Sequence, residues 1–262
     1  MDKVSVIMPC YNSEKYVADA IQSVLNQTHQ NLELLICDDS STDGSLQVIK
    51  KFVAKDSRVQ LFGNAYLKGA PGARNTCLDA ATGDFISFLD ADDLWLEDKL
   101  EKHIEFMVSN DAAFSYSHVN RINEDGGFVC VHLSPDEVDA KKMCFANFIP
   151  CSTAIFNSHV VGHIHQPNIE KRNDFALWLK ILNSKKVRKA YCFKEVTSSY
   201  RANTYGLSSN KVDAIRYYHK CLTDYNNCSK TVAFMYLFAY IPLILLKQKF
   251  PSYYNVMATR FF

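Results

Sequence analysis

The segment GDFISFLDADD, residues 83–93, decides how this part of the chain folds. FISFL (85–89) is a run of strand-forming apolar residues, and the carboxylates of Asp90, Asp92 and Asp93 follow it directly. Carboxylates at the end of a buried strand repel one another and resist desolvation. They therefore indicate either a cationic partner at that end of the strand or a solvated turn that caps the next helix.

Three further apolar runs precede this one, and a helical pattern follows each of them. The expected strands are residues 3–8, 32–37, 59–62 and 85–89, and the expected helices are residues 12–27, 45–55, 73–81 and 96–110. Strands separated by helices of this length are typical of βαβ units. We therefore predict an α/β fold with a Rossmann-like, mostly parallel sheet flanked by helices.

The alternation weakens after residue 112. We predict a hairpin from residues 113–122 and 126–133, a strand within 147–156, a helix that begins at Asp174, and strands at 187–193 and 195–201. No change in composition marks a linker before residue 210. The prediction is one domain, 1–210, with halves 1–110 and 111–210, followed by a helical tail, 211–262.

Composition restricts the class of protein. Hydrophobic residues make up 48% and charged residues 22% of the 262 residues, as in a globular protein with a sizeable core. A net charge of +1 argues against nucleic-acid binding. The nine cysteines include no CxxC pair, which indicates reduced thiols in a cytosolic compartment. The N-terminus lacks the pattern of a signal peptide, so we expect no export.

The tail is basic and rich in aromatic residues. Residues 211–262 contain seven Lys or Arg against two Asp, a balance of +5. Residues 231–246 carry no charge, but they are fewer than the roughly 20 that a spanning helix needs, and we expect Pro242 to interrupt them. Two interpretations stay open: a segment that lies in the membrane interface, or a helix pair that packs on the main domain.

Polar segments follow three of the predicted strands. They are PCYNSE (9–14), DDSSTD (38–43) and DADD (90–93). Ligands of open α/β sheets bind outside the carboxyl ends of the strands, so we expect these segments to converge on one crevice. Asp90 and Asp92 point the same way in extended backbone and suit Mg²⁺ or Mn²⁺, which prefer oxygen ligands. We expect Asp93 instead to cap the following helix.

Other candidate residues lie near these segments. Asp39 can accept hydrogen bonds from a nucleobase or a ribose, although Asp38 and Asp39 could also belong to a helix cap. Tyr11 could stack on a base or simply pack. The sequence contains neither GxGxxG nor GxxxxGK[ST], so a metal, with Arg74 or Arg201, would have to balance phosphate charge.

His163 and His165 form an HxH pair of the kind that ligates zinc. No cysteine or carboxylate lies near them at ligand spacing in the sequence. We therefore do not expect a zinc site there.

Three segments together resemble the N-terminal half of the family 2 glycosyltransferases: residues 4–28, 33–45 and 72–93. RNDFALWLKIL (172–182) and SYRANTYGLS (199–208) resemble two later motifs of that family more loosely. The resemblance covers residues 1 to about 210 and not the tail. It implies the GT-A fold and inverting transfer from a nucleotide-diphosphate sugar.

The resemblance also implies roles for the matching residues on the donor side. Pro9, Tyr11 and Asp39 would form the nucleobase pocket, and Glu14 lies in the same donor-binding segment. Asp90 and Asp92 would be the DxD motif, in which Asp92 is the direct ligand of Mn²⁺ or Mg²⁺ and Asp90 lies near the ribose and phosphates.

On the acceptor side the resemblance implies that Asp174 is the catalytic base and that Trp178 lines the site. Arg74 and Arg201 would lie near the diphosphate. The chain departs from the family pattern at Asn173, where an acidic residue is frequent, and at Asn203, where a histidine is frequent.

The resemblance, taken with the tail, implies a bacterial enzyme that is cytoplasmic and peripheral to the inner membrane. We expect it to transfer a hexose, glucose before galactose, from a UDP-sugar to a saccharide linked to undecaprenyl diphosphate in O-antigen or related polysaccharide synthesis. Two alternatives are a non-catalytic member that binds nucleotide sugars and a sugar-nucleotide pyrophosphorylase. The pyrophosphorylase should carry a glycine-rich loop, which PCYNSEKY lacks.

Overall fold

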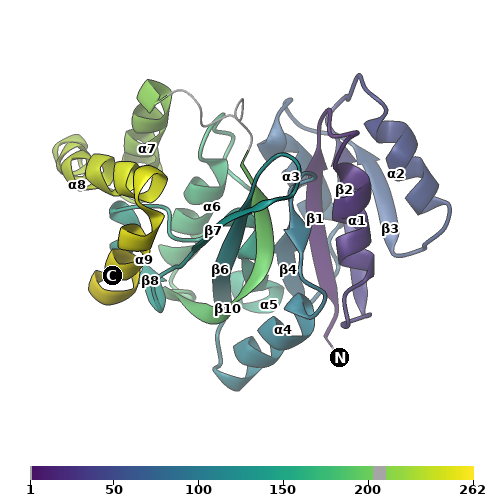
Figure 1. The fold of residues 1–262 in the computed structure, drawn as a ribbon, viewed down its shortest axis with the longest axis horizontal. Helices are drawn as coiled ribbons and strands as arrows, with labels where there is room; N and C mark the ends of the chain where they lie inside the picture. The colour runs from purple at the N-terminus through teal and green to yellow at the C-terminus, as the bar shows by residue number, and fades with distance from the viewer. Residues whose placement is uncertain (1, 203–210) are drawn as a thin grey trace.

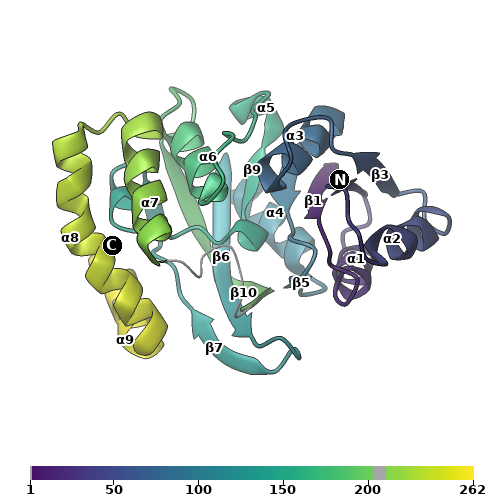
Figure 2. The same cartoon turned by 90° about the horizontal axis from the view of Figure 1, so that it is seen from above.

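A central sheet with helices on both faces forms the core of the protein in the computed structural model, which describes residues 2–202 and 211–262 (Figures 1 and 2). The strands are β1 Val4–Cys10, β2 Leu32–Asp38, β3 Val59–Gly63, β4 Phe85–Phe88, β5 Leu94–Trp95, β6 Phe114–Ile122, β7 Phe128–His132, β8 Glu137–Asp139, β9 Ile155–Asn157 and β10 Lys189–Arg201. The helices are α1 Val17–Leu25, α2 Ser45–Val53, α3 Ala70–Ala80, α4 Lys99–Ser109, α5 Ser158–Val161, α6 Asn173–Leu182, α7 Lys211–Tyr225, α8 Lys230–Lys249 and α9 Pro251–Phe261.

The first half of the sheet is parallel, with the order β3-β2-β1-β4, as the alternating pattern predicts. Cys10 lies opposite Asp38, and Ile7 lies opposite Phe88, so these strands end at the same edge. Helix α1 joins β1 to β2, α2 joins β2 to β3, and α3 joins β3 to β4. The polar segments that follow the strands are thereby brought to one edge of the sheet.

Side chains of β1 and β2 alternate between two hydrophobic cores. Ile7 and Leu35 face one core, whereas Val6 and Leu34 face the other, and all four are fully buried. Successive side chains of a strand point to opposite faces of the sheet, so a strand that is covered on both faces appears in the sequence as a continuous apolar run. This is the physical reason that the first strands could be recognised in the sequence.

The second half of the sheet is mixed. β9 lies between β4 and β6 and is antiparallel to both, while β10 is parallel to β6 and antiparallel to β5. The predicted hairpin forms as β6 and β7. The two strands predicted at 187–193 and 195–201 are one strand, β10, with a register shift between Phe193 and Val196.

Two other local predictions need correction. The strand predicted within 147–156 begins only at Ile155, because a 3₁₀ turn, Cys151–Thr153, follows Pro150. Helix α8 runs through Pro242, so this proline does not interrupt the apolar segment. A proline within a helix removes one backbone hydrogen bond, and the buried side chains of α8 compensate by packing on the domain.

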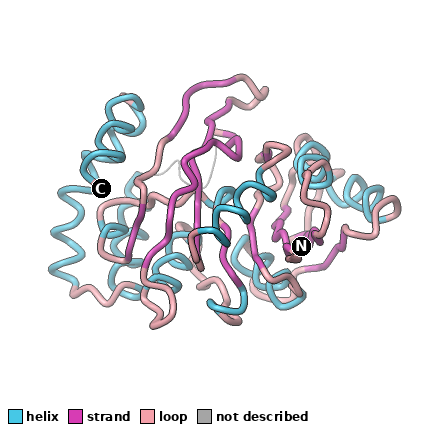
Figure 3. The backbone as a smooth tube through the Cα atoms, turned by 90° about the horizontal axis from the view of Figure 1, so that it is seen from below, coloured by secondary structure: helices cyan, strands magenta, loops and turns pink. Residues whose placement is uncertain are grey.

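The tail forms three helices rather than a pair: α7 packs against α6, α8 against α7, and α9 against α8 and β7 (Figure 1). The C-terminus lies among helices at one end of the molecule (Figure 3). The ring of Tyr218 in α7 stacks on Phe175 of α6 at 5.5 Å and on Tyr240 of α8 at 3.9 Å between ring centroids. The Asn255 amide in α9 donates a hydrogen bond of 2.8 Å to the carbonyl oxygen of Val131 in β7. These contacts favour the interpretation that the tail packs on the domain, and they leave open what its outer face contacts.

Candidate active site

Asp39 is held at the end of β2 by two hydrogen bonds. Its Oδ1 accepts one of 2.6 Å from the Asn64 amide, and its Oδ2 accepts one of 2.8 Å from the backbone N–H of Gly69. The residue is only 5% exposed. Asp39 is therefore a fixed acceptor at the edge where the first strands end, and it is not a helix cap.

The segment after β1 contacts the segment after β2. Tyr11 is 48% exposed, and the Lys68 ammonium lies 4.7 Å from the centroid of its ring. The Glu14 carboxylate accepts a hydrogen bond of 2.9 Å from the N–H of Gly44, the residue before α2. Pro9 lies in β1 opposite Cys37. The structure thus gives Glu14 a contact that joins the two segments, and it leaves Tyr11 partly exposed beside Lys68.

Arg74 connects the two halves of the chain. Its guanidinium donates a hydrogen bond to Asp90 and another, of 2.8 Å, to Asn173 at the start of α6. The Arg74 side chain is 5% exposed and the Asp90 side chain is 32% exposed. Burial opposes the charge of Arg74, but nearby acidic groups, Asp90 foremost, together outweigh burial and raise the pKa of Arg74 above its ordinary value.

Asp93 and Arg201 fix the loop that carries Asp92. Oδ1 of Asp93 accepts a hydrogen bond of 2.9 Å from the backbone N–H of Arg201, and Oδ2 accepts one from the Ser152 hydroxyl. The Arg201 Nε donates a hydrogen bond of 2.9 Å to the carbonyl oxygen of Asp92. Burial raises the pKa of Asp93 well above its ordinary value, and the charges of Asp92 and Asp90 act in the same direction.

The prediction that Asp93 caps the next helix is wrong. The residue that precedes α4 is Asp98, and the short strand β5 comes between Asp93 and that helix. Asp93 is 1% exposed and bonds across the sheet to the end of β10. These partners come from distant parts of the sequence, so the local pattern of residues 90–96 could not indicate them.

Asp174 lies in the first turn of α6, next to Asn173. Its Oδ2 accepts a hydrogen bond of 2.8 Å from the Asn147 amide, and the side chain stays partly accessible. Asn173 is bonded to Arg74, which also holds Asp90. A partly exposed carboxylate from the second half of the chain is thereby placed close to the carboxylates that follow β4.

The comparisons with known proteins identify the family to which this chain belongs. Residues 5–151 match the model of glycosyl transferase family 2. The chain belongs to this family. It is 36% identical over 247 residues to the Escherichia coli UDP-Glc:alpha-D-GlcNAc-diphosphoundecaprenol beta-1,3-glucosyltransferase WfgD, across 94% of this chain and 95% of that protein.

WfaP of Escherichia coli, which is named for the same activity as WfgD, is 41% identical over 211 residues, which cover 80% of this chain and 82% of WfaP. The fold matches S. aureus TarS 1-349 in complex with UDP, with a TM-score of 0.65 and 19% identity over 95% of this chain and 73% of TarS 1-349. It also matches a mannosyltransferase from Pyrobaculum calidifontis in complex with GDP-Man and Mn²⁺, with a TM-score of 0.64 and 16% identity over 98% and 73% of the two chains. This glycosyltransferase therefore has the GT-A fold.

Trp178 does not line the acceptor site of this family 2 glycosyltransferase, contrary to the expectation. It is fully buried, and its ring lies 5.5 Å from Phe88 and 5.3 Å from Phe114 between centroids. The Trp178 Nε1 has no hydrogen-bond partner among the described residues. Trp178 is a core residue on the inner face of α6. Asn203, where the family frequently has a histidine, lies outside the described residues.

Four side chains that hold the predicted site residues in place were not recognised in the sequence. Asn64 holds Asp39, Asn147 holds Asp174, and Ser152 holds Asp93. The Gln166 amide donates a hydrogen bond of 2.9 Å to Asn173 and lies within 3.4 Å of Arg74. Each of these residues is separated from its partner by 7 or more positions, so no local motif contains the pair.

The carboxylates after β4 fit a hard divalent cation. Oxygen donors of Asp90 and Asp92 are the ligands that Mg²⁺ and Mn²⁺ prefer. Asp90 is partly exposed toward solvent while Arg74 holds one of its oxygens, whereas the buried Asp93 is bonded to Ser152 and the backbone of Arg201. The residues present therefore suit a cation that Asp90 and Asp92 hold, and Asp93 supports the loop from inside.

Proposed function

We propose that the enzyme transfers glucose from UDP-glucose, with inversion, to an α-linked GlcNAc on diphosphoundecaprenol during synthesis of an O-antigen or a related surface polysaccharide. The similarity to WfgD over nearly the full length of both chains carries the proposal, because that relative has this donor, acceptor and linkage in its name. WfaP supports the same assignment. Galactose is the second candidate for the transferred sugar.

The donor nucleoside would bind at the ends of β1 and β2. The fixed oxygens of Asp39 would accept hydrogen bonds from the uracil ring, and the partly exposed ring of Tyr11 would stack on the base. Pro9 would form the adjacent wall. Glu14 would act from behind by holding the segment after β2 through Gly44. Asp39 and Tyr11 would select the base, and Pro9 and Glu14 would give the pocket its shape.

Asp90 and Asp92 would hold Mn²⁺ or Mg²⁺ together with the donor. When bound, this cation supplies positive charge to the diphosphate leaving group. Arg201 would keep Asp92 in place through the carbonyl of the loop, and Arg74 would keep Asp90 in place through its carboxylate. The two arginines are proposed as positioning residues whose charge also faces the diphosphate.

Asp174 would be the general base. It would take the proton from the acceptor hydroxyl while that oxygen attacks the anomeric carbon on the face opposite the diphosphate. The hydrogen bond from Asn147 orients its carboxylate, and the hydrogen bond from Arg74 to Asn173 fixes the start of α6. An asparagine at 173 leaves a single carboxylate at this helix start for the proton transfer.

The tail would place the enzyme on the cytoplasmic face of the inner membrane, where a lipid-linked acceptor lies. Helix α8 is long and apolar enough to cross a membrane by length and composition alone, and 17% of its apolar window is buried. Phe234 and Phe238 are 56% and 71% exposed on α8, and the exposed Lys249 follows at its end. Exposed aromatic side chains near a lysine suit the interface of an anionic membrane.

A donor screen with a defined acceptor tests the proposal. The purified enzyme is incubated with radiolabelled UDP-glucose, UDP-galactose or UDP-GlcNAc and a synthetic GlcNAc-α-diphospholipid, and the lipid product is separated and its linkage determined. We expect transfer from UDP-glucose and a β-1,3 linkage. Transfer from UDP-galactose alone would replace the sugar in the proposal, and no transfer from any donor to the lipid-linked acceptor would refute it.

A further inference from the structure

Asp79, His163 and His165 come together outside the proposed active site. Asp79 lies near the C-terminal end of α3, and the two histidines lie in the segment between α5 and α6. The Asp79 Oδ1 is 2.6 Å from Nε2 of His165 and 3.4 Å from Nε2 of His163. The two Nε2 atoms are 3.2 Å apart. Three ligand atoms from two distant parts of the chain thus point at one spot.

Two of their three separations are those of a tetrahedral metal site. Ligand atoms about 2.0–2.1 Å from Zn²⁺ in a tetrahedron lie roughly 3.3 Å from one another. The separations of 3.2 and 3.4 Å match that edge, and the separation of 2.6 Å is a direct hydrogen bond between Asp79 and His165 that a cation would replace. The side chains are 37–68% exposed, so a water molecule can reach the fourth position.

The ligand types select the metal. Two imidazole nitrogens and one carboxylate oxygen suit Zn²⁺, whereas Mg²⁺ and Mn²⁺ favour oxygen ligands such as those of Asp90 and Asp92. Sequence spacing had argued against zinc because no carboxylate lies near His163 and His165 in the chain. The fold supplies the carboxylate from α3, which removes that objection.

Tyr66 supports the cluster from behind. Its hydroxyl donates a hydrogen bond of 2.5 Å to Oδ2 of Asp79, and its ring lies edge-on to His165 with 5.5 Å between centroids. Burial works against the charged carboxylate, but the hydrogen bonds from Tyr66 and His165 outweigh it and lower the pKa of Asp79 below its ordinary value. Groups that orient metal ligands in this way raise the affinity of metal sites.

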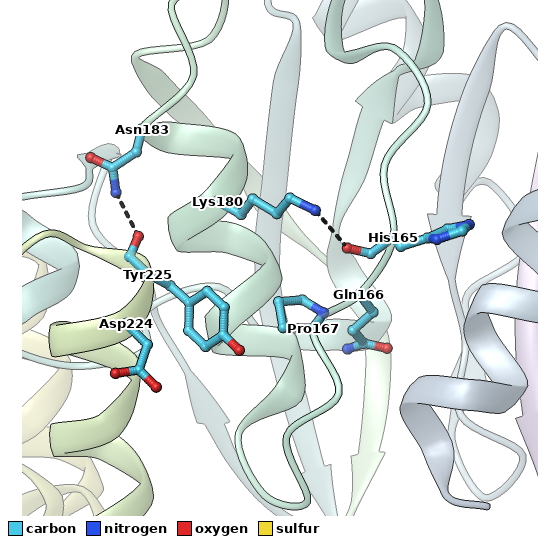
Figure 4. Close-up of a pocket in the computed structure, with 7 residues that line it drawn as sticks. All are labelled: His165, Gln166, Pro167, Lys180, Asn183, Asp224 and Tyr225. Atoms are coloured by element: carbon cyan, nitrogen blue, oxygen red, sulfur yellow. Dashed lines mark hydrogen bonds between the residues drawn. The ribbon is translucent and has the colours of Figure 1, made fainter. Parts of the chain in front are cut away.

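The cluster joins α3 to the segment that leads into α6. Gln166, next to His165, is bonded through its backbone N–H to Asn75 of α3 at 2.7 Å, and its amide donates to Asn173. Figure 4 shows the other side of this segment, where the His165 carbonyl accepts a hydrogen bond of 3.2 Å from Lys180 while its imidazole points away from Lys180. That carbonyl borders a pocket of about 430 Å³, whose lining residues include none of the proposed active-site side chains.

We propose that Asp79, His163 and His165 form a Zn²⁺ site, separate from the catalytic cation, that cross-links α3 to the segment before α6. Zinc bound there holds Gln166 against Asn75 and thereby supports the contact between Arg74 and Asn173. The inference does not depend on the identity of the sugar or the acceptor, because zinc binding is measured without substrates.

Calorimetric titration of the full-length, tag-free protein with Zn²⁺ after chelation tests the site, with Co²⁺ absorption as a readout of tetrahedral ligands. We expect saturable binding that His163→Ala, His165→Ala and Asp79→Asn each weaken at least about tenfold, and that Tyr66→Phe weakens about tenfold. The matched control is His159→Ala, because His159 is an exposed histidine paired with Asp84 at 2.8 Å and should not contribute. Absence of binding by the wild type, or an equal loss in His159→Ala, overturns the proposal.

Hydrogen exchange tests the cross-link itself. Added Zn²⁺ should slow exchange of the backbone amides of residues 163–169 in the wild type and leave them unchanged in Asp79→Asn. Slowing that persists in Asp79→Asn, or no slowing in the wild type, contradicts the cross-linking role.

Discussion

The guanidinium of Arg74 donates a hydrogen bond of 2.8 Å to Asn173, a residue 99 positions further along the chain. The same guanidinium holds Asp90. One buried side chain therefore links the loop after β4, which carries Asp90 and Asp92, to the start of the helix that carries Asp174. A planar guanidinium can bond both partners at once, whereas an ammonium at the end of a flexible chain cannot fix both in the same way.

We expect Arg74→Lys to lower kcat about 100-fold with a smaller change in the affinity for UDP, because the carboxylates and the base lose their relative placement. Steady-state transfer assays and UDP titrations measure the two effects. Arg58→Lys is the control, since Arg58 pairs with Asp56 at 2.7 Å outside the proposed active site. Wild-type kcat in Arg74→Lys would contradict the positioning role.

The neighbouring aspartates should separate into two classes. Asp92→Asn should raise the Mn²⁺ concentration that half-maximal activity requires by about tenfold or more, because one oxygen ligand of the cation is lost. Titration of the transfer rate with Mn²⁺ measures this effect, and a chelator should abolish transfer by the wild type. An unchanged Mn²⁺ requirement in Asp92→Asn would remove it from the metal site.

Asp93→Ala should instead lower the free energy of unfolding by about 1–3 kcal/mol, because it leaves the buried donors of Arg201 and Ser152 without their acceptor. Urea denaturation followed by circular dichroism measures the change. The Mn²⁺ requirement of the folded fraction should rise less than in Asp92→Asn, because both proposed oxygen ligands of the cation remain. A stability equal to that of the wild type would contradict the role assigned to Asp93 inside the loop.

The first half of the fold could be read from the sequence because its strands are buried on both faces. β1 and β2 are continuous apolar runs, and the polar segments after them, with Asp39, Asp90 and Asp92, lie at one edge as predicted. The resemblance implied that Trp178 lines the acceptor site, but a motif does not say which way a side chain of the helix points, and Trp178 packs into the core against Phe88 and Phe114. Asp93 was placed wrongly because its partners come from β10 and the turn at Ser152.

For the HxH pair, the sequence shows two of the proposed ligands but not the third. His163 and His165 were visible in the sequence, and Asp79 is separated from His165 by 86 positions. Spacing rules detect ligands that share one helix, strand or turn. A site assembled from α3 and a distant loop becomes visible only when the fold is known.

Lys99 gives a prediction about pH. It is fully buried beside Trp95 and the carbonyl of Thr153, and burial lowers its pKa from 10.5 to about 7. Between pH 7 and 10.5, Lys99 carries a proton in the unfolded chain but not in the native state. The contribution of Lys99 to the free energy of unfolding therefore rises with pH in this window and is constant below it. Urea unfolding should show that Lys99→Met has a higher free energy of unfolding than the wild type at pH 7. The difference between the two free energies should shrink toward pH 10.5. A difference that does not vary with pH would contradict the lowered pKa.

The outer face of α8 should govern membrane binding. The double substitution Phe234→Ser and Phe238→Ser should weaken binding to anionic vesicles about 100-fold or more, since each buried phenylalanine contributes about 1.5–3 kcal/mol. Vesicle sedimentation measures the partition. Val108→Ser is the control, because Val108 is 62% exposed on α4. Equal partition of the double variant and the wild type would contradict the proposed docking face.

The central claim is that this glycosyltransferase uses Asp174 as its base at a UDP-sugar site assembled across the two halves of the chain. Single-turnover transfer by Asp174→Asn, measured beside UDP binding, tests it most directly. Asp98→Asn is the matched control, because Asp98 precedes α4 and pairs with the exposed Lys102. We predict that Asp174→Asn loses at least about 100-fold in the transfer rate while its affinity for UDP stays within about twofold of the wild type. A transfer rate equal to that of Asp98→Asn would contradict the assignment.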